Sequence, residues 1–116
     1  MSSRVYGASH IWIEGNRIGL SRYAARELDG IVMVSIDAGE YREGEAFGVV
    51  ESRKTASELI SPCEMRVVRV NSVVEMTPEV LDERSEEVEL AEVEVISGLE
   101  RMKTPEEYER YVSELR

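Results

Sequence analysis

The sequence contains very little cysteine and histidine. Among 116 residues there is one cysteine, Cys63, and one histidine, His10. A single cysteine cannot form an intramolecular disulfide, and no cluster of histidines and cysteines has metal-ligand spacing. We therefore expect no metal site. Because disulfides are rare in reducing compartments, this cysteine usage also indicates a cytoplasmic protein.

Long apolar runs and positive charge are scarce as well. No run approaches the ~20 apolar residues that cross a bilayer, and the first residues lack the apolar stretch of a signal peptide. The chain has 14 basic residues against 24 acidic ones, a net charge of −10. Phosphate backbones and anionic lipids attract positive potential, so we expect neither nucleic acid nor membrane as a partner.

The acidic surplus lies in the second half of the chain. Residues 1–60 carry 7 basic and 9 acidic side chains, whereas residues 61–116 carry 7 and 15. This excess indicates either a solvating surface or the steering of a basic partner. Among the 14 basic residues, only Lys54 and Lys103 are lysines.

The chain has enough apolar material for one core. Hydrophobic residues make up 42% of the sequence, and a chain of this length forms one domain in most proteins. We expect a single domain over residues 1–116, with its core at about 9–97 and a C-terminal helix at about 104–115. We also expect it to be a monomer.

The first half of the sequence predicts a hairpin, a helix and strands. Short β-prone runs at 11–13 and 18–20 flank Gly15-Asn16, a typical hairpin turn. Ser21 can cap a helix over 22–28 that ends at Asp29-Gly30. The apolar run 31–36 has the length of a buried strand, residues 41–45 are turn-like, and 47–52 predicts another strand.

The second half predicts further strands and a terminal helix. Strands are expected at 65–70 and at 86–96, where acidic and apolar residues alternate and would form a strand with one acidic face. Pro78 can begin one or two helical turns over 78–84. Thr104, Pro105 and Glu107 form a capping-box pattern, followed by an apolar stripe. The stripe consists of Tyr108, Tyr111, Val112 and Leu115. Many short strands with small helices predict a β-rich sandwich or flattened barrel.

Conventional catalytic motifs are missing. The sequence has no Gly-x-Ser-x-Gly motif, no phosphate loop and no dinucleotide fingerprint. His10 has no positioned nucleophile beside it and is interpreted as a packing or strand-edge residue. Cys63 is interpreted as a small buried hydrophobe. We expect a protein that is not an enzyme.

One lysine lies between two β-prone segments. Residues 47–51 and 59–60 are largely apolar, and the polar residues between them include Lys54. A lysine at the tip of a hairpin is exposed on a rigid mount, and arginine cannot replace it where a primary amine must be acylated. The alternative is a short helix over 52–59 with a solvated lysine.

This segment resembles the lipoyl-lysine motif of the glycine cleavage system H protein family. The matching stretch is Gly48-Val49-Val50-Glu51-Ser52-Arg53-Lys54-Thr55-Ala56-Ser57-Glu58, followed by Ser61-Pro62. Further similarity lies in Ser9-His10-Ile11-Trp12-Ile13, Ile18-Gly19-Leu20-Ser21-Arg22-Tyr23-Ala24, Glu27-Leu28, Val70-Asn71, Pro78-Glu79-Val80-Leu81 and Glu106-Glu107-Tyr108.

The resemblance implies a mainly β, flattened two-sheet sandwich of lipoyl/biotinyl type, a barrel-sandwich hybrid, with short helices and a C-terminal amphipathic helix. Lys54 would carry lipoate in amide linkage, attached by a lipoate ligase or lipoyl transferase. Glu51, Ser52, Arg53 and Ala56 would present that lysine. The arm would shuttle an aminomethyl group and reducing equivalents among glycine decarboxylase, aminomethyltransferase and dihydrolipoamide dehydrogenase.

The chain also departs from the family pattern. Ile11 stands where the family has a glutamate that helps to hold the ammonium group of the loaded arm, which leaves Ser9 and Glu58 as contacts. Arg53 replaces an apolar neighbour of the lysine, and Arg84-Ser85-Glu86-Glu87 stands in place of a Pro-Tyr…Gly-Trp segment. These departures suggest an alternative, a related lipoyl carrier for sulfur-compound oxidation or another redox pathway, or for lipoate relay. A separate and less favoured alternative is an unlipoylated binding module.

Overall fold

Two antiparallel sheets form the body of the protein. The structure is a computed structural model that describes residues 3–115. The prediction that the first residues form no signal peptide rests in part on residues 1–2, which lie outside the described range. The larger sheet has the strand order β1-β2-β3-β9-β8-β5, and the smaller has the order β4-β6-β7. The larger sheet comprises β1 (Val5–Tyr6), β2 (Ile11–Glu14), β3 (Arg17–Leu20), β9 (Ala91–Ser97), β8 (Glu64–Val70) and β5 (Gly39–Tyr41).

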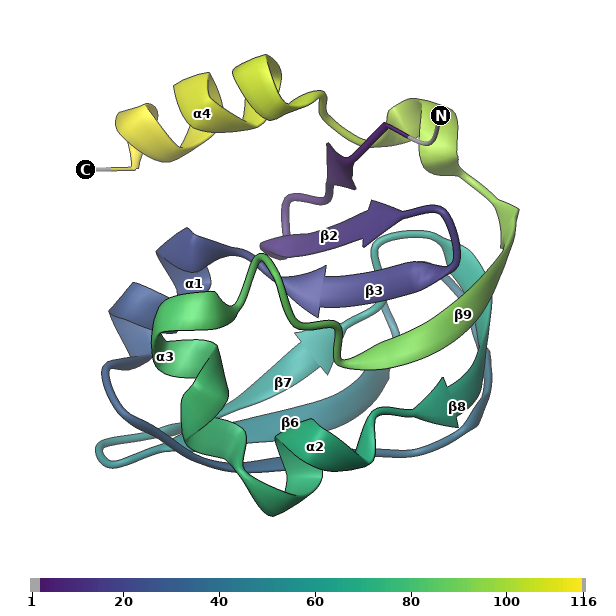
Figure 1. The fold of residues 1–116 in the computed structure, drawn as a ribbon. Coiled ribbons are helices and arrows are strands. Elements are labelled where there is room, and N and C mark those ends of the chain that lie inside the picture. The colour runs from purple at the N-terminus through teal and green to yellow at the C-terminus, as the bar shows by residue number, and fades with distance from the viewer. Residues whose placement is uncertain (1–2, 116) are drawn as a thin grey trace.

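The smaller sheet lies against the larger one and buries the main core between them (Figure 1). It comprises β4 (Ile31–Ile36), β6 (Ala46–Ser52) and β7 (Ala56–Ile60). Ile18 of the larger sheet and Val50 and Leu59 of the smaller one belong to a single buried cluster. The predicted mainly β, two-sheet sandwich with a C-terminal helix is confirmed.

The N-terminal hairpin and the helix after it lie where the sequence predicts them. Glu14 pairs with Arg17, so Gly15 and Asn16 form a two-residue turn, and Gly15 has a φ of 62° that suits glycine. Helix α1 (Arg22–Leu28) begins after Ser21, whose side chain accepts a hydrogen bond from the Ala24 N–H. The helix ends at Asp29, which adopts a left-handed conformation.

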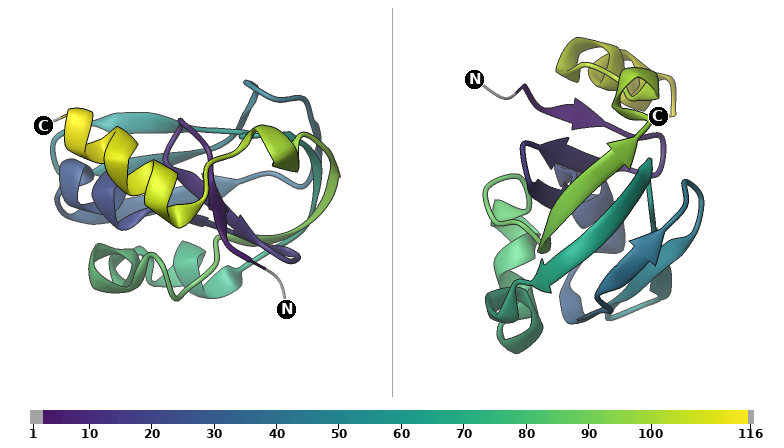
Figure 2. Two further views of the ribbon diagram at one scale, coloured as in Figure 1. Left: turned by 90° about the horizontal axis from the view of Figure 1, so that it is seen from above. Right: turned by 90° about the vertical axis from the view of Figure 1, so that its right-hand side faces the viewer.

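Trp12 lies on the opposite face of β2 from the main core. Ile11 and Ile13 belong to the main buried cluster, whereas Trp12 packs with Tyr6 and with Tyr108 and Val112 of helix α4 (Pro105–Glu114). Helix α4 therefore crosses the outer face of the N-terminal strands, as the view from above shows (Figure 2). The strand periodicity of two creates these two faces and gives the terminal helix a docking surface.

The capping box of α4 is confirmed. Thr104 accepts from the Glu107 N–H, and the Glu107 carboxylate accepts from the Thr104 N–H. These bonds lower the pKa of Glu107, because they favour its ionised form. The predicted apolar stripe is correct for the buried Tyr108 and Val112 but wrong for Leu115, which is 48% exposed because it lies past the end of the helix.

A strand is present at 31–36 as predicted, but it is only partly buried. The bounds of β4 match, but the strand lies at the edge of the smaller sheet, and a register shift between Ile31 and Met33 turns both Val32 and Met33 outward. Residues 41–45 are turn-like except for Tyr41, which ends β5.

The strand predicted at 86–96 begins only at Ala91. Residues 85–90, which precede it, form an irregular segment, and the buried Trp12 Nε1 donates to the Ser85 carbonyl there at 3.1 Å. The predicted acidic face of β9 is also paired with arginines of β8: Arg66 lies opposite Glu94, and Arg69 opposite Glu92. The face is therefore less acidic than the alternation suggests.

Short helices join β8 to β9. They are α2 (Ser72–Met76), the 3-10 turn η1 (Pro78–Val80) and α3 (Leu81–Arg84). The helical turns after Pro78 are confirmed, whereas α2 is not among the predicted elements. A second 3-10 turn, η2 (Leu99–Arg101), precedes α4. Within residues 3–115, no helix is long and apolar enough to cross a membrane.

Candidate functional site

Lys54 lies in the turn between β6 and β7. The two strands pair up to Glu51 and Ala56, and the four residues between them reverse the chain. This arrangement confirms the hairpin interpretation, and the alternative of a helix over 52–59 is wrong. The Lys54 side chain is exposed.

The Ser52 hydroxyl fixes the shape of this turn. The backbone N–H of Ser52 donates to the Thr55 carbonyl at 2.8 Å. Ser52 Oγ also donates to that carbonyl at 3.2 Å, and it accepts from the N–H groups of Lys54 at 3.4 Å and Thr55 at 3.2 Å. Ser52 is buried with 8% exposure. A buried side chain that bonds its own turn in this way holds the following lysine in one backbone geometry.

Arg53 connects the turn to the end of α1. Its backbone N–H donates to the Gly30 carbonyl at 3.0 Å. Its guanidinium lies over the Gly30 α-carbon so closely that a methyl group there would overlap it. Gly30 also has a φ of 90°, a conformation that glycine adopts without strain. The arginine therefore braces the hairpin against the helix.

The two lysines have different surroundings. Lys54 takes part in none of the ion pairs found among residues 3–115. Lys103 is half-buried, its backbone pairs with Tyr6, and its Nζ lies 4.9 Å from the centre of the Tyr111 ring. Lys54 is thus the more accessible primary amine.

A cavity of about 370 Å³ lies between α1 and the two strands of the lysine hairpin. Its wall includes Val50 of β6, Glu58 of β7 and Leu28 of α1. The volume lies in the range of small-ligand pockets. Ser57, which also lines it, is three residues from Lys54 along the chain.

The residues predicted to contact a loaded arm meet in this cavity. Ser9 and Glu58 both line it, although they come from different parts of the chain, and so does Ile11, which stands in place of the family's glutamate. Ser9 Oγ donates to the Ile60 carbonyl at 3.0 Å, which ties the loop before β2 to β7. Ile11 is only 1% exposed and packs in the main core.

Glu27 also lines the cavity, although it is not among the site residues predicted from the sequence. It lies on α1 and lines the same cavity as Glu58. The signal was present in the helical spacing, because Glu27 follows Tyr23 by four residues and Ala24 by three, and both also line the cavity.

His10 lines the cavity and contacts the terminal helix. Its Nδ1 lies 2.7 Å from the Tyr108 hydroxyl, and its ring centre lies 4.8 Å from that of Tyr23. Burial lowers the pKa of His10, and the negative charge of Glu27 partly opposes that shift. The residue is half-buried before β2, close to the predicted strand-edge position.

Cys63 is a buried structural residue. It has no exposed surface, and burial raises the pKa of its thiol to about 11. A thiol with so high a pKa is a poor nucleophile at neutral pH. The interpretation of Cys63 as a small hydrophobe agrees with its position.

Comparisons with known proteins agree on one family. The model of the family described as "Glycine cleavage H-protein" matches residues 4–115. Glycine cleavage system H proteins from two strains of Staphylococcus epidermidis are 36% identical over 118 residues, covering 94% of this chain and 94% of each relative. The crystal structure of such a protein from Mycobacterium marinum superimposes with a TM-score of 0.85 at 26% identity, covering 96% of this chain and 97% of that one.

Proposed function

The chain belongs to the glycine cleavage H-protein family, and on that premise we propose that it is a non-catalytic carrier whose lipoyl arm is attached to Lys54. The observation that carries this proposal is the position of Lys54, an exposed amine at the tip of a braced hairpin. The match covers nearly the whole chain, which favours glycine cleavage over another lipoyl-dependent pathway or an unlipoylated module.

The residues around Lys54 fit a covalently attached lipoyl group. The exposed amine allows an acylating enzyme to approach, while the Ser52 hydrogen bonds and the Arg53–Gly30 contact hold the backbone below it. Glu51 and Ala56 form the last strand pair before the turn and set its direction. The cavity beside the hairpin has apolar walls and room for the end of a flexible arm.

Lipoate, when bound, supplies a dithiolane that can carry an aminomethyl group and two electrons. We expect a lipoate ligase or lipoyl transferase to attach it. We expect glycine decarboxylase, aminomethyltransferase and dihydrolipoamide dehydrogenase to be the enzymes that the carrier meets, as a monomer in the cytoplasm. The chain itself contributes presentation and shelter.

Shelter would come from the cavity wall. Leu28, Val50 and Leu59 provide apolar surface, while Ser9 and Glu58 provide oxygen atoms in the same wall. Apolar walls exclude water from a bound group, and oxygen atoms can accept hydrogen bonds from an ammonium. These residues would protect the end of the arm between visits to its enzymes.

Lys54→Arg tests the attachment site. We expect intact-mass analysis after treatment with a lipoate ligase to show one added lipoyl group on the wild-type protein and none on Lys54→Arg, because arginine has no acylatable amine. Lys103→Arg is the matched control and should be lipoylated like the wild type. Modification of Lys54→Arg to the wild-type level would eliminate the assignment.

The pathway is tested with the lipoylated protein. Supplied with glycine, glycine decarboxylase and aminomethyltransferase, it should support transfer of the glycine methylene carbon to tetrahydrofolate. If dihydrolipoamide dehydrogenase turns over the protein but no carbon is transferred, the chain serves another lipoyl-dependent pathway.

A further inference from the structure

Four exposed apolar side chains lie on two neighbouring elements of the fold. Val32 and Met33 are exposed on β4, and Val73 and Met76 are exposed on α2. β4 is an edge strand of the smaller sheet, and α2 and η1 lie beside it. We call the surface formed by these elements the α2–β4 face. Exposed apolar residues that gather at one place, rather than singly, indicate an interaction surface.

The segments that form the α2–β4 face carry acidic charge only. Residues 29–37, which include β4, and residues 70–83, which include α2 and η1, contain six acidic and no basic residues. The acidic residues are Asp29, Asp37, Glu75, Glu79, Asp82 and Glu83. We call these six the acidic rim. The face thus combines exposed apolar side chains with negative charge.

The acidic rim is not neutralised by ion pairs within the protein. None of its six carboxylates takes part in an ion pair among residues 3–115, whereas Glu92 and Glu94 of the larger sheet pair with arginines. Arg84 follows the rim in sequence but pairs with Glu87. The rim therefore keeps its negative potential, which attracts a basic surface.

The α2–β4 face begins beside the turn that carries Lys54. Ile31, the first residue of β4, pairs with Ser52, where that turn starts. Arg53 of the same turn lies over Gly30, so the face borders the turn directly. A protein that engages the side chain of Lys54 and also covers this face would bury one continuous surface.

The acidic rim disfavours a second copy of this chain as the occupant of the face. A two-fold dimer through this face would bring the same residues of both copies together, and like charges would then oppose association. A surface of apolar side chains surrounded by lysines or arginines matches both the exposed apolar residues and the rim. We propose that the α2–β4 face docks an enzyme with such a surface while that enzyme acts on the arm of Lys54.

The proposal rests on the proposed function, because it assigns the docked enzyme to the arm, but its binding chemistry can be measured without the arm. The probe is an amphipathic helical peptide of leucine and lysine, titrated into unlipoylated, ¹⁵N-labelled protein. Two control peptides have serine in place of leucine, or glutamate in place of lysine. We expect the leucine–lysine peptide to shift amide signals of β4 and α2 and to bind roughly tenfold more tightly than either control. Equal binding of the serine–lysine peptide, or shifts centred on α4, overturns the proposal.

A double variant tests the apolar part of the face. Val32→Thr with Met76→Gln replaces two exposed side chains, so we expect it to fold like the wild type. The KM for this protein is measured with lipoate ligase, glycine decarboxylase, aminomethyltransferase and dihydrolipoamide dehydrogenase. We expect at least one KM to rise roughly three- to tenfold at unchanged kcat. Ile96→Thr, at an exposed apolar position of β9, is the control and should match the wild type. Unchanged KM values with all four enzymes overturn the proposal.

A second double variant tests the acidic rim. Glu75→Gln with Glu79→Gln removes two exposed negative charges, so the same KM should rise and should depend less on salt concentration than that of the wild type. Glu106→Gln with Glu109→Gln is the control, because it removes two exposed charges from α4. An equal change in both variants would show an effect of net charge alone and would overturn the proposal.

Lipoylation separates this proposal from the proposed function. Unchanged KM values in a protein that is lipoylated at Lys54 and transfers the glycine carbon overturn the docking role of the α2–β4 face alone. Failure of the wild-type protein to be lipoylated at Lys54 overturns the proposed function, and the enzyme as occupant of the face with it, whatever the result of the peptide titration.

Discussion

His10 combines an unusual backbone conformation with a half-buried ring. Its φ of 71° lies in the left-handed region, and its backbone N–H donates to the Gly7 carbonyl at 3.0 Å in a tight turn before β2. This turn directs the ring toward Tyr108 of α4, with which its Nδ1 shares a hydrogen bond. The residue thereby links the cavity wall to the terminal helix.

Burial of His10 predicts a pH dependence of stability. Its pKa in the folded protein lies below the ordinary value of about 6.5, so the unfolded chain takes up the proton first as the pH falls. Stability should therefore decrease below about pH 6.5, by at most about 1.4 kcal/mol per pH unit for this one group. Above that pH both states are neutral and His10 contributes no slope.

The measurement is urea denaturation of wild type and His10→Asn between pH 5 and pH 7. Asparagine tolerates the left-handed conformation and does not titrate in this range. We expect the difference in unfolding free energy between the two proteins to change in favour of the variant as the pH falls. Parallel pH profiles would show that the ring is not protected from protonation.

At the scale of the element, the hairpin of β6 and β7 gives residues 53 and 54 different contacts. Both residues are exposed, but Arg53 also contacts Gly30 through its backbone N–H and its guanidinium. Moving the amine by one residue, in the double variant Arg53→Lys with Lys54→Arg, would place it beside the end of α1. We expect the initial rate of lipoylation to fall roughly tenfold or more, because acyl transfer depends strongly on position.

The single variant Arg53→Lys is the control, since it keeps Lys54 in place and should acquire one lipoyl group at that residue. Peptide mapping after ligase treatment distinguishes the two positions. Equal rates for the shifted and wild-type lysines would show that the presentation of the turn does not govern modification.

The sequence predicts most local elements but not how they come together. Caps and turns depend on neighbouring residues, so Ser21, Thr104 and the Gly15-Asn16 turn are identifiable from the chain alone. The start of β9 and the outward face of β4 depend on partners distant in sequence. The position of Glu27 also depends on distant partners, because its place in the cavity requires α1 to lie beside β7.

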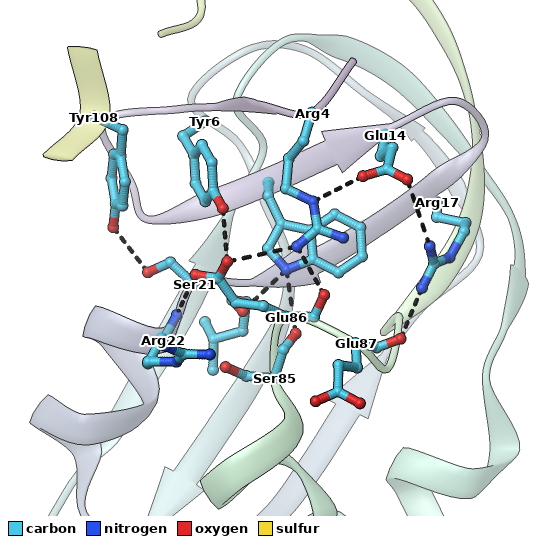
Figure 3. Close-up of polar contacts among 12 residues, drawn as sticks. Arg4, Tyr6, Glu14, Arg17, Ser21, Arg22, Ser85, Glu86, Glu87 and Tyr108 are labelled. Carbon is cyan, nitrogen blue, oxygen red and sulfur yellow. Dashed lines mark hydrogen bonds and ion pairs between the residues drawn. The ribbon is translucent and has the colours of Figure 1, made fainter. Parts of the chain in front are cut away.

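At the scale of the whole molecule, Glu86 joins three distant parts of the chain. Its carboxylate accepts from the Tyr6 hydroxyl at 2.6 Å and from the Arg22 N–H at 2.8 Å, and it lies 3.5 Å from the Arg4 guanidinium (Figure 3). Arg4 also donates to the Glu86 carbonyl and stacks 3.8 Å from the centre of the Trp12 ring. The N-terminal strand, the start of α1 and the connection to β9 thus meet at one carboxylate.

Glu86→Gln should loosen this junction. The amide keeps the shape of the side chain but loses the charge and one of the two acceptors. We expect a loss of about 1–2 kcal/mol in unfolding free energy, because the hydrogen bonds of this carboxylate are charge-assisted and partly shielded. Glu87→Gln is the control: Glu87 is exposed and pairs only with Arg84 among residues 3–115, so its replacement should change stability by less than about 0.5 kcal/mol.

Tyr6 gives a second, local measurement of the same junction. Burial, together with the hydrogen bond and charge of Glu86, raises its pKa to about 12. In Glu86→Gln the pKa of Tyr6 should fall but stay above its ordinary value of about 10, because burial remains. Ultraviolet titration of the phenol should detect this change in Glu86→Gln and not in Glu87→Gln. A Tyr6 pKa that is the same in both variants would mean that Glu86 does not contact the ring hydroxyl in solution. The N-terminal strand would then be held by its backbone pairing with β2 and Lys103 and by packing against Trp12 and α4, without this carboxylate.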